Sequence, residues 1–280
     1  MKGKTVLVTG GNSGMGLATT IEMARRGAQV IMACRSRQRG EEALAEAKRQ
    51  SGSPDIALML CDLASFDSIR SFAEEFSSKY PVLDVLINNA GVVTIRRELT
   101  SDGYEMDFGV NHLGHFLLSN LLLDSLKSAE QGRIVVVASG AYKIGKLHLD
   151  DHTLSRGFNP AKAYARSKLA NILFTRELAA RLQHTAVTVN AVHPGAVGTS
   201  IGVNRETGFG RPLLKLLSYF FLTPEQGADT AIYLATAPEL CGVTGQYYYR
   251  RAIQELSPRA ADSAAAARLW EWSLEQTGLK

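Results

Sequence analysis

The sequence predicts an α/β fold in which a doubly wound parallel sheet of about seven strands is covered by helices on both faces. Two observations lead to this prediction and to that of a single domain. Short, continuously apolar runs alternate with longer amphipathic stretches along the chain, and strands buried on both faces of a parallel sheet have this composition. The alternation recurs without a long linker, an internal repeat or a low-complexity segment, which indicates one domain over residues 1–280.

The expected elements follow one another in regular order. Strands are predicted over residues 5–9, 29–33, 56–60, 84–88, 133–138, 187–192 and 246–249. Helices are predicted over residues 14–26, 37–50, 66–79, 103–127, 161–183 and 225–236, followed by a terminal helix in which Trp270 and Trp272 serve as packing residues.

Two segments interrupt this order. Residues 140–162 form a long polar connection, and residues 196–223 begin Gly-rich and end strongly apolar. Loops of this length in a compact domain are usually functional or disordered. The second segment carries too much apolar surface for disorder, and we expect it to be a substrate lid.

The composition describes a soluble globular protein. Hydrophobic residues make up 45% and charged residues 21% of the chain, and the net charge is only +4. The basic residues are scattered, so we expect no nucleic-acid partner. Cys34, Cys61 and Cys241 lack the CxxC pairing of a zinc site, and their small number suits a reduced compartment.

Membrane and export signals are not expected from the sequence. No apolar run approaches the ~20 residues that a membrane span needs. The first residues enter a strand-like run at once, which leaves no room for a signal peptide. We therefore expect a cytoplasmic protein.

A glycine-rich turn, TGGNSGMG (9–16), follows the first predicted strand and opens directly into a helix. Gly10, Gly14 and Gly16 permit a tight turn and close approach of a pyrophosphate to the backbone, and the helix N-terminus offers free N–H groups to the anion. A strand before this turn, a helix after it and a second strand at the expected distance together predict a Rossmann-type dinucleotide site.

The end of the second predicted strand indicates the kind of dinucleotide. It reads MACRSRQRG (32–40), with no acidic residue before Glu41, whereas NAD enzymes tend to place a carboxylate there for the ribose hydroxyls. Arg35 is placed to bind a 2′-phosphate, so we expect NADP(H) as the cofactor. The positive charges of Arg37 and Arg39 either add to the attraction for the 2′-phosphate or are simply solvated.

A set of motifs in fixed order covers essentially the whole chain and resembles the short-chain dehydrogenase/reductase family. The motifs are TGGNSGMG, Asp62, NNAG (88–91), Asn111, Ser139 and YARSK (164–168). Further segments resemble the retinol-dehydrogenase-like branch of that family, namely ACR (33–35), VNHLGHFLL (110–118), SKLANILF (167–174), HPGAVGT (193–199) and LWEWS (269–273).

The resemblance implies cofactor-binding residues at the matching positions. They are Gly10, Asn12, Ser13, Gly14, Met15 and Gly16 for the phosphates, Asp62 and Leu63 for the adenine, Asn89, Ala90 and Gly91 for the ribose, and Pro194, Gly195, Val197 and Thr199 for the nicotinamide carboxamide. Arg35 also fits the NADP-preferring pattern of the family.

YARSK places a phenol and an ammonium group four residues apart, on one face of a helix. Hydride transfer to a carbonyl leaves negative charge on oxygen, which needs a hydrogen-bond donor and a proton source. Ser139, at the end of the fifth predicted strand, would be the donor, and Tyr164 the general acid/base. We expect Lys168 to lower the pKa of Tyr164 from about 10 by ~1–3 units.

The resemblance adds two roles to these. Lys168 would also bind the nicotinamide ribose, with Tyr164 as a further cofactor-binding residue, and Asn111, within the long predicted helix, would hold a water that links Lys168 to solvent. His112 and His115 are spaced i, i+3 without a third ligand, so we expect structural histidines and no metal.

One feature departs from the family pattern. Ser139 and Tyr164 are 25 positions apart, about twice the separation in many members, and the extra residues fall in the inserted loop 140–162. The insertion could cover a helix face that other members use for oligomerisation. Whether the protein is a monomer or a homodimer therefore stays open.

The apolar half of the lid favours a lipophilic alcohol/carbonyl pair such as a retinoid, a steroid or an aliphatic ketone. Two alternatives are open: these side chains only pack on the domain, or they make shallow membrane contact with Arg211 and Lys215 at the lipid surface. Alternative functions are the same chemistry on a polar or polyketide-like metabolite, and NADP sensing without turnover. A protein that only senses NADP needs no proton donor, so the presence of Asn111, Ser139, Tyr164 and Lys168 argues against a sensor.

Overall fold

Eight strands form a single sheet in the computed structural model, which describes residues 1–195 and 222–280. The strand order is β3-β2-β1-β4-β5-β6-β7-β8, and neighbouring strands are parallel except for the antiparallel pair β7–β8. The strands are β1 (Thr5–Thr9), β2 (Gln29–Cys34), β3 (Ile56–Leu60), β4 (Val85–Asn88), β5 (Arg133–Val137), β6 (Thr188–His193), β7 (Tyr247–Tyr249) and β8 (Ala252–Ile253).

Helices follow most of the strands. The longer ones are α1 (Gly14–Arg25), α2 (Arg37–Ser51), α3 (Phe66–Lys79), α5 (His115–Leu121), α7 (Pro160–Arg181), α9 (Pro224–Thr236) and α11 (Ser263–Thr277). The shorter ones are α4 (Met106–Phe108), α6 (Leu123–Lys127), α10 (Pro258–Ala261), a π-helix η1 (Gly109–Gly114), and the 3₁₀ turns η2 (Gly140–Ile144), η3 (Leu149–Asp151) and η5 (Pro238–Leu240).

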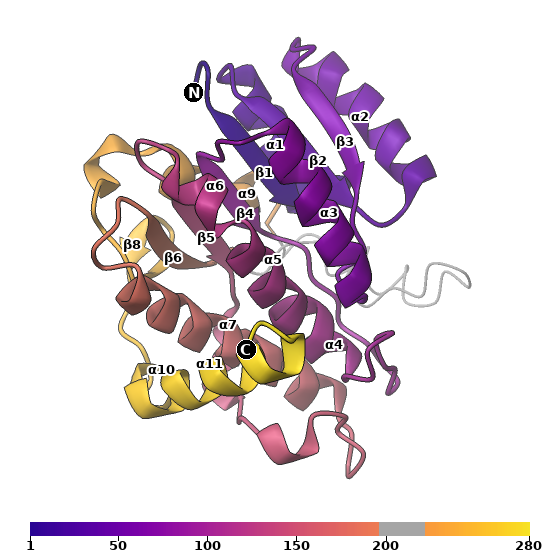
Figure 1. Cartoon of the computed structure of the whole chain (residues 1–280), viewed down its shortest axis with the longest axis vertical. Helices are drawn as coiled ribbons and strands as arrows, with labels where there is room; N and C mark the ends of the chain where they lie inside the picture. The colour runs from indigo at the N-terminus through magenta and orange to yellow at the C-terminus, as the bar shows by residue number, and fades with distance from the viewer. Residues whose placement is uncertain (196–221) are drawn as a thin grey trace.

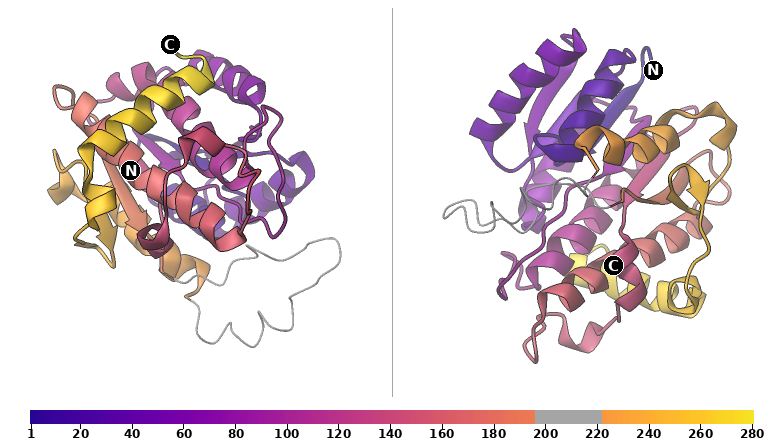
Figure 2. Two further views of the ribbon diagram at one scale, coloured as in Figure 1. Left: turned by 90° about the horizontal axis from the view of Figure 1, so that it is seen from below. Right: turned by 180° about the vertical axis from the view of Figure 1, so that it is seen from behind.

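Alternating side chains of the strands divide the core into two layers. On β1, Leu7 belongs to the cluster formed with α3, α5 and α11, whereas Val6 and Val8 belong to the cluster formed with α1, α2 and α9. Figure 1 shows the first group of helices in front of the sheet, with α11 lying across α7. In the rear view of Figure 2, the second group faces the viewer, α1 and α2 in indigo and violet and α9 in orange.

Local sequence explains where the long helices begin. Asn159 caps α7 by accepting a hydrogen bond from the Lys162 N–H at 3.1 Å, and Pro160 takes the first helical position. The helix α9 begins with a reciprocal capping box between Thr223 and Gln226. These caps fix the first turn of both helices, including α7, which carries YARSK.

The seven predicted strands are confirmed, each within one residue at either end. The sequence analysis missed β8, which has two exposed residues, Ala252 and Ile253, and pairs only with β7. An element this short and exposed has no apolar pattern to reveal it. The assignment of residues 1–280 to one domain stays a prediction.

The predicted helix 103–127 is wrong in its continuity. Residues 103–105 precede the helix, η1 interrupts it, and Leu122 separates α5 from α6. Glycines let this segment approach its neighbours closely: a Cβ on Gly114 would lie 2.6 Å from the Leu63 carbonyl oxygen, and one on Gly109 would lie 2.3 Å from Thr100 Cγ2. These contacts, rather than the helical repeat, determine the local path of the backbone.

The connection 140–162 also contains helical turns that were not predicted. It contains η2 and η3, and its last residues belong to α7. Tyr142 is buried, and its ring meets Tyr247 edge-on at 5.3 Å between centroids. Most of the predicted lid, residues 196–221, lies outside the described residues. None of the helices in residues 1–195 and 222–280 is both long and apolar enough to cross a membrane.

Candidate active site

The glycine turn follows β1, the strand at which the strand order of the sheet reverses, because β2 and β4 flank β1 on opposite sides. Ligands of open α/β sheets bind at such points. Gly10 and Gly14 have positive φ angles of 65° and 51°, which glycine adopts without strain. A Cβ on Gly16 would lie 2.2 Å from the Gly10 carbonyl oxygen. Among the described residues no side chain caps α1 at Ser13, so the first N–H groups of the helix are available to phosphates. The turn therefore fits a dinucleotide.

Thr9 joins this turn to the NNAG segment. Its hydroxyl oxygen accepts hydrogen bonds from the N–H groups of Asn89 (2.9 Å) and Ala90 (3.0 Å), and Asn89 Nδ2 donates to the Thr9 carbonyl at 2.8 Å. The same hydroxyl lies 2.9 Å from His115 Nε2, whose Nδ1 lies 3.1 Å from the Asn111 carbonyl. A carbonyl only accepts, so Nδ1 carries the proton and Nε2 accepts from Thr9.

The adenosine side of the site contains Arg35, Asp62 and Leu63. Arg35 directly follows β2 and is exposed, and Leu63 is buried. Asp62 Oδ1 accepts a hydrogen bond from the Ala64 N–H at 3.0 Å, which fixes the carboxylate after β3. Arg37 is exposed and pairs with Glu41 at 3.7 Å, which favours the interpretation of Arg37 as a solvated residue of the helix start.

Tyr164, Lys168 and Ser139 lie together at the carboxyl end of β5. Lys168 is 3% exposed, its Nζ donates to the Val137 carbonyl at 3.0 Å, and the same Nζ lies 5.5 Å from the centroid of the Tyr164 ring. Ser139 lies two residues beyond β5 rather than at its end, and its hydroxyl oxygen caps η2 by accepting from the Ala141 N–H at 3.2 Å. Ser139 also lies close enough to Tyr164 to lower the pKa of its phenol, although burial has the larger, opposite effect.

The predicted lowering of the Tyr164 pKa by Lys168 is wrong for this structure. Burial raises the pKa of Tyr164 from 10.0, hydrogen bonding with Ser139 opposes the rise, and the negative charge of Asp107 adds to it. Burial also lowers the pKa of Lys168 itself to about 8. The spacing of YARSK placed the two groups correctly on α7, but it carried no information about desolvation.

Asn111 lies within the π-helix η1 instead of a regular helix. Its Oδ1 accepts from the Val92 N–H at 2.8 Å, and its Nδ2 donates to the Val92 carbonyl and to Ser167 Oγ, both at 3.0 Å. Ser167 Oγ in turn donates to the Tyr164 carbonyl at 2.8 Å. Asn111 therefore connects Val92, in the segment that follows NNAG, with the helix that carries Tyr164.

The residues expected at the nicotinamide carboxamide are only partly described. Pro194 and Gly195 follow β6, and Gly195 has a φ of 85°. Pro194 lines an open hollow of about 210 Å³ between β6, α9 and the β7–β8 turn. Val197 and Thr199 lie outside the described residues.

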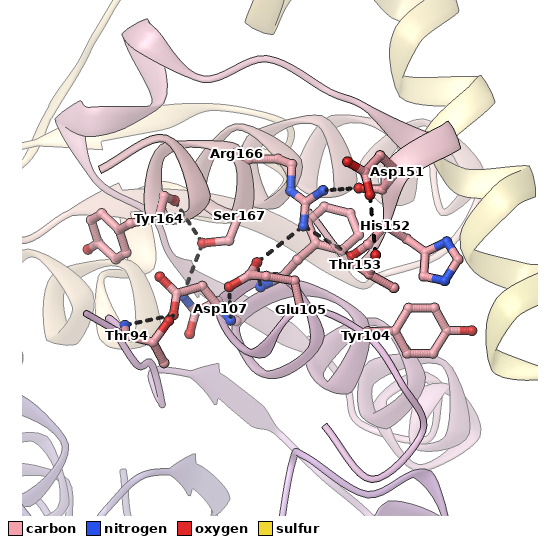
Figure 3. A network of polar contacts seen from close by, with 12 residues as sticks. Thr94, Tyr104, Glu105, Asp107, Asp151, His152, Thr153, Tyr164, Arg166 and Ser167 are labelled. Atoms are coloured by element: carbon pink, nitrogen blue, oxygen red, sulfur yellow. Dashed lines mark hydrogen bonds and ion pairs between the residues drawn. The ribbon is translucent and has the colours of Figure 1, made fainter. Parts of the chain in front are cut away.

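The sequence analysis missed several residues that the site uses. Thr9 and Ser167 link the predicted motifs, and Asp107 is a fully buried carboxyl on the same helical segment as Asn111. The i, i+4 spacing of Asp107 and Asn111 is a signal that could have identified the former. Figure 3 shows Asp107 together with Thr94, Tyr164 and Ser167.

The two histidines of HLGH are buried and hydrogen-bonded. His112 Nε2 contacts Ser273 Oγ at 3.1 Å and His115 bonds Thr9 and Asn111, while burial lowers their pKa values to about 3 and about 4. Within the described residues no group of three His, Cys, Asp or Glu side chains could hold a metal. Trp270 and Trp272 pack on α11, Trp270 against Phe116 and Trp272 against Phe108.

Comparison with known proteins identifies relatives along the whole chain. A family model for short chain dehydrogenases matches residues 4–208. Retinol dehydrogenase 14 of Homo sapiens is 49% identical over 294 residues, which span 100% of this chain and 88% of that protein. The crystal structure of an uncharacterized protein from Mycobacterium paratuberculosis has a TM-score of 0.78 at 35% identity, and the match covers 99% of this chain and 94% of the other. A variant of actinorhodin polyketide ketoreductase with NADPH has a TM-score of 0.66 at 27% identity, with 87% and 94% covered.

Proposed function

The chain belongs to the short chain dehydrogenase family, and from this premise we propose that it is an NADP(H)-dependent oxidoreductase that interconverts an alcohol and a carbonyl on a lipophilic substrate. Membership of the family and the retinol dehydrogenase relatives support oxidoreductase chemistry on a CH–OH group. The cofactor preference, the substrate class and the roles of individual residues are our proposals.

The convergence of Tyr164, Lys168 and Ser139 at the end of β5 is the observation that carries this proposal. A bound nicotinamide would supply or accept the hydride. Tyr164 would give a proton to the carbonyl oxygen in reduction and remove one from the alcohol in oxidation. Ser139 would donate a hydrogen bond to the same oxygen, and the Lys168 ammonium would stabilise negative charge that develops nearby.

Asn111 would hold this arrangement in place and, as the family pattern implies, a water beside Lys168. Gly91 approaches both residues: a Cβ there would lie 3.4 Å from Asn111 Oδ1 and 3.7 Å from Lys168 Nζ. The phosphate-binding part would comprise Gly10, Asn12, Ser13, Gly14, Met15 and Gly16, the adenosine part Arg35, Asp62 and Leu63, the ribose part Asn89, Ala90, Gly91 and Lys168, and the carboxamide part Pro194, Gly195, Val197 and Thr199.

The substitution Tyr164→Phe tests the mechanism. General acid–base catalysis typically contributes 10²–10⁴-fold, so NADPH oxidation with a panel of carbonyls should fall by about that factor, while NADPH binding, followed by fluorescence, stays the same. Tyr80→Phe removes a phenol at the C-terminal end of α3, on a different helix from Tyr164, and serves as the matched control. Undiminished turnover in Tyr164→Phe would refute the mechanism. Tight NADPH binding without turnover of any carbonyl would instead favour the sensor.

Preference for NADP(H) is supported by the exposed guanidinium of Arg35 after β2 and by the absence of a carboxylate from residues 32–40. Arg35→Asp should weaken NADPH binding much more than NADH binding, because only NADPH carries the 2′-phosphate. Arg37→Asp makes the same charge change two residues away and should affect NADPH much less. An equal loss of both dinucleotides in Arg35→Asp would contradict the assignment.

A lipophilic substrate is supported by the similarity to retinol dehydrogenase 14 and by the apolar residues between 209 and 222. The similarity to a polyketide ketoreductase keeps a polyketide-like ketone as the alternative, and parallel panels of retinoids, steroids and polar ketones would separate the two. The lid, its contact with substrate or membrane, the cytoplasmic location and the oligomeric state stay predictions.

A further inference from the structure

Asp107 is a buried carboxyl group close to the catalytic residues. Its side chain is fully buried in α4, and its Oδ1 accepts hydrogen bonds from Thr94 N (2.9 Å) and Thr94 Oγ1 (3.0 Å). Its Oδ2 is buried and has no hydrogen-bond partner among the described residues. Buried polar oxygens are rarely left without a partner, so the carboxyl group calls for a functional explanation.

The unpartnered carboxyl faces the catalytic helix. Figure 3 shows Asp107 between Thr94 and the turn of α7 that carries Tyr164 and Ser167. Lys168 Nζ lies in the same surroundings, because a Cβ on Gly91 would lie 3.7 Å from it and 3.4 Å from Asn111 Oδ1. Burial is the main influence on the pKa values of Tyr164 and Lys168; the negative charge of Asp107 adds to the rise for Tyr164 and opposes the fall for Lys168. Asn111, one helical turn beyond Asp107, hydrogen-bonds Ser167 in the same turn of α7.

Other charged groups near Asp107 are already paired or are neutral. Glu105, two residues earlier, forms a buried ion pair with Arg166 at 3.1 Å, and the charge of Asp107 also reaches Arg166, though less strongly than that of Glu105. The charge of Glu105 and burial together raise the pKa of Asp107 to about 7. His115, which the charge of Lys168 reaches, is neutral near pH 7 because burial lowers its pKa to about 4. Lys168 is thus the cation whose positive charge the Asp107 carboxylate can balance.

We propose that Asp107 is a positioning residue of the active site, whose carboxylate is the counter-charge that holds Lys168 as an ammonium and Tyr164 as a phenol. This inference rests on the proposed function of Tyr164 and Lys168. A negative charge beside both groups stabilises the cation and opposes the phenolate. The phenol with an adjacent ammonium is the form that can give a proton to a carbonyl oxygen, so a charged Asp107 favours reduction.

The ionisation of Lys168 in the cofactor-free protein tests this inference directly. The NMR signal of the Lys168 side-chain ¹³Cε, assigned by its loss in Lys168→Ala, would be followed against pH in the wild type, in Asp107→Asn and in Asp124→Asn. Asp124 is an exposed carboxylate of α6, so the control makes the same chemical change away from the site. We expect the Lys168 midpoint to fall by about one pH unit in Asp107→Asn and to stay the same in Asp124→Asn.

Activity provides a second readout. In carbonyl reduction, the alkaline limb of the kcat profile should move to lower pH in Asp107→Asn, with little change in KM for the carbonyl, because Asp107 does not touch the substrate. If Asp107→Asn does not fold, Thr94→Val removes one hydrogen bond to the carboxylate. Asp107 then stays protonated to higher pH, and the Lys168 midpoint should fall by a smaller amount.

The outcomes separate this inference from the proposed function. An unchanged Lys168 midpoint in Asp107→Asn, with carbonyl reduction intact, would overturn the role of Asp107 and leave the proposed function standing. A lowered midpoint in a protein that reduces no carbonyl would support the electrostatic role of Asp107 and count against the proposed function. A lowered midpoint together with a shifted alkaline limb would support both.

Discussion

The Glu105→Gln substitution would leave the Arg166 guanidinium buried without its carboxylate partner. In the native protein Glu105 and Arg166 are 0% and 2% exposed, and their charged atoms lie 3.1 Å apart. Glu105 also caps α4, because its carboxylate accepts from the N–H groups of Asp107 (2.9 Å) and Phe108 (3.1 Å). In the substituted side chain an amide donor replaces one of these oxygens and faces other donors.

The size of the effect follows from burial. Removing one partner of a buried ion pair costs about 3–5 kcal/mol. Arg166 keeps hydrogen bonds to the Asp151 (3.0 Å) and His152 (3.3 Å) carbonyls and its position 4.5 Å above the Phe108 ring, so we expect a value near the lower end. Because a folded domain is stable by only ~5–15 kcal/mol, about 3 kcal/mol is a large fraction of its stability.

Urea denaturation followed by circular dichroism would measure this loss. With a slope of ~3 kcal/mol per molar urea, the midpoint should fall by about 1 M. Glu75→Gln is the matched control: Glu75 pairs with Lys79 at 2.6 Å, but both are more than half exposed, and exposed pairs contribute ~0–1 kcal/mol. The double variant Glu105→Gln, Arg166→Met removes both charges but keeps a side-chain oxygen that can cap α4, and it should recover part of the loss. A loss no larger than that of Glu75→Gln would refute the reasoning.

Two further predictions concern the polar groups around the site. Thr9→Val leaves the N–H groups of Asn89 and Ala90 without their acceptor and should cost about 2–6 kcal/mol in urea denaturation, at ~1–3 kcal/mol for each buried unsatisfied group. Thr20→Val should be neutral or stabilising, because the buried Thr20 hydroxyl has no partner among the described residues; similar losses in both variants would contradict this account. The pKa of Asp107 is raised from 3.8 to about 7, so the folded state binds more protons between these values and loses stability, on the order of 4 kcal/mol, as pH rises through that window. Asp107→Asn should remove this pH dependence from the unfolding free energy, and curves that stay parallel to the wild type from about pH 4 to 8 would show that Asp107 does not titrate near 7.

The sequence was sufficient for the sheet and for the positions of the motifs. Strands such as β1 and β5 are buried on both faces, so their apolar runs have sharp ends that can be read directly. The YARSK spacing correctly placed Tyr164 and Lys168 on one helix. These features depend on local composition, which a single sequence contains.

Features that depend on the surroundings could not be predicted. The interruption at Gly109–Gly114 depends on how closely Leu63 and Thr100 approach the helix, and the apolar repeat Leu113, Phe116, Leu117 continues from it into α5 without a break in spacing. The pKa of Tyr164 depends on burial and on Asp107, which is 57 positions away in the chain. Desolvation and long-range charge are properties of the folded molecule and leave no periodic signal.

The π-helix η1 also has a consequence for the length of the chain at this point. A π turn contains more residues than the 3.6 of an α-helical turn, so Asn111 occupies a place that a regular helix of the same endpoints would not provide. Deleting one residue from Gly109–Gly114 would allow regular α-helical hydrogen bonds from Met106 to Leu121. The resulting helix would be locally more favourable, yet it would rotate Asn111 away from Val92 and Ser167. A regular helix would therefore need one residue fewer among these six residues, whereas the geometry of the site needs all of them. The native chain has the length that the site needs.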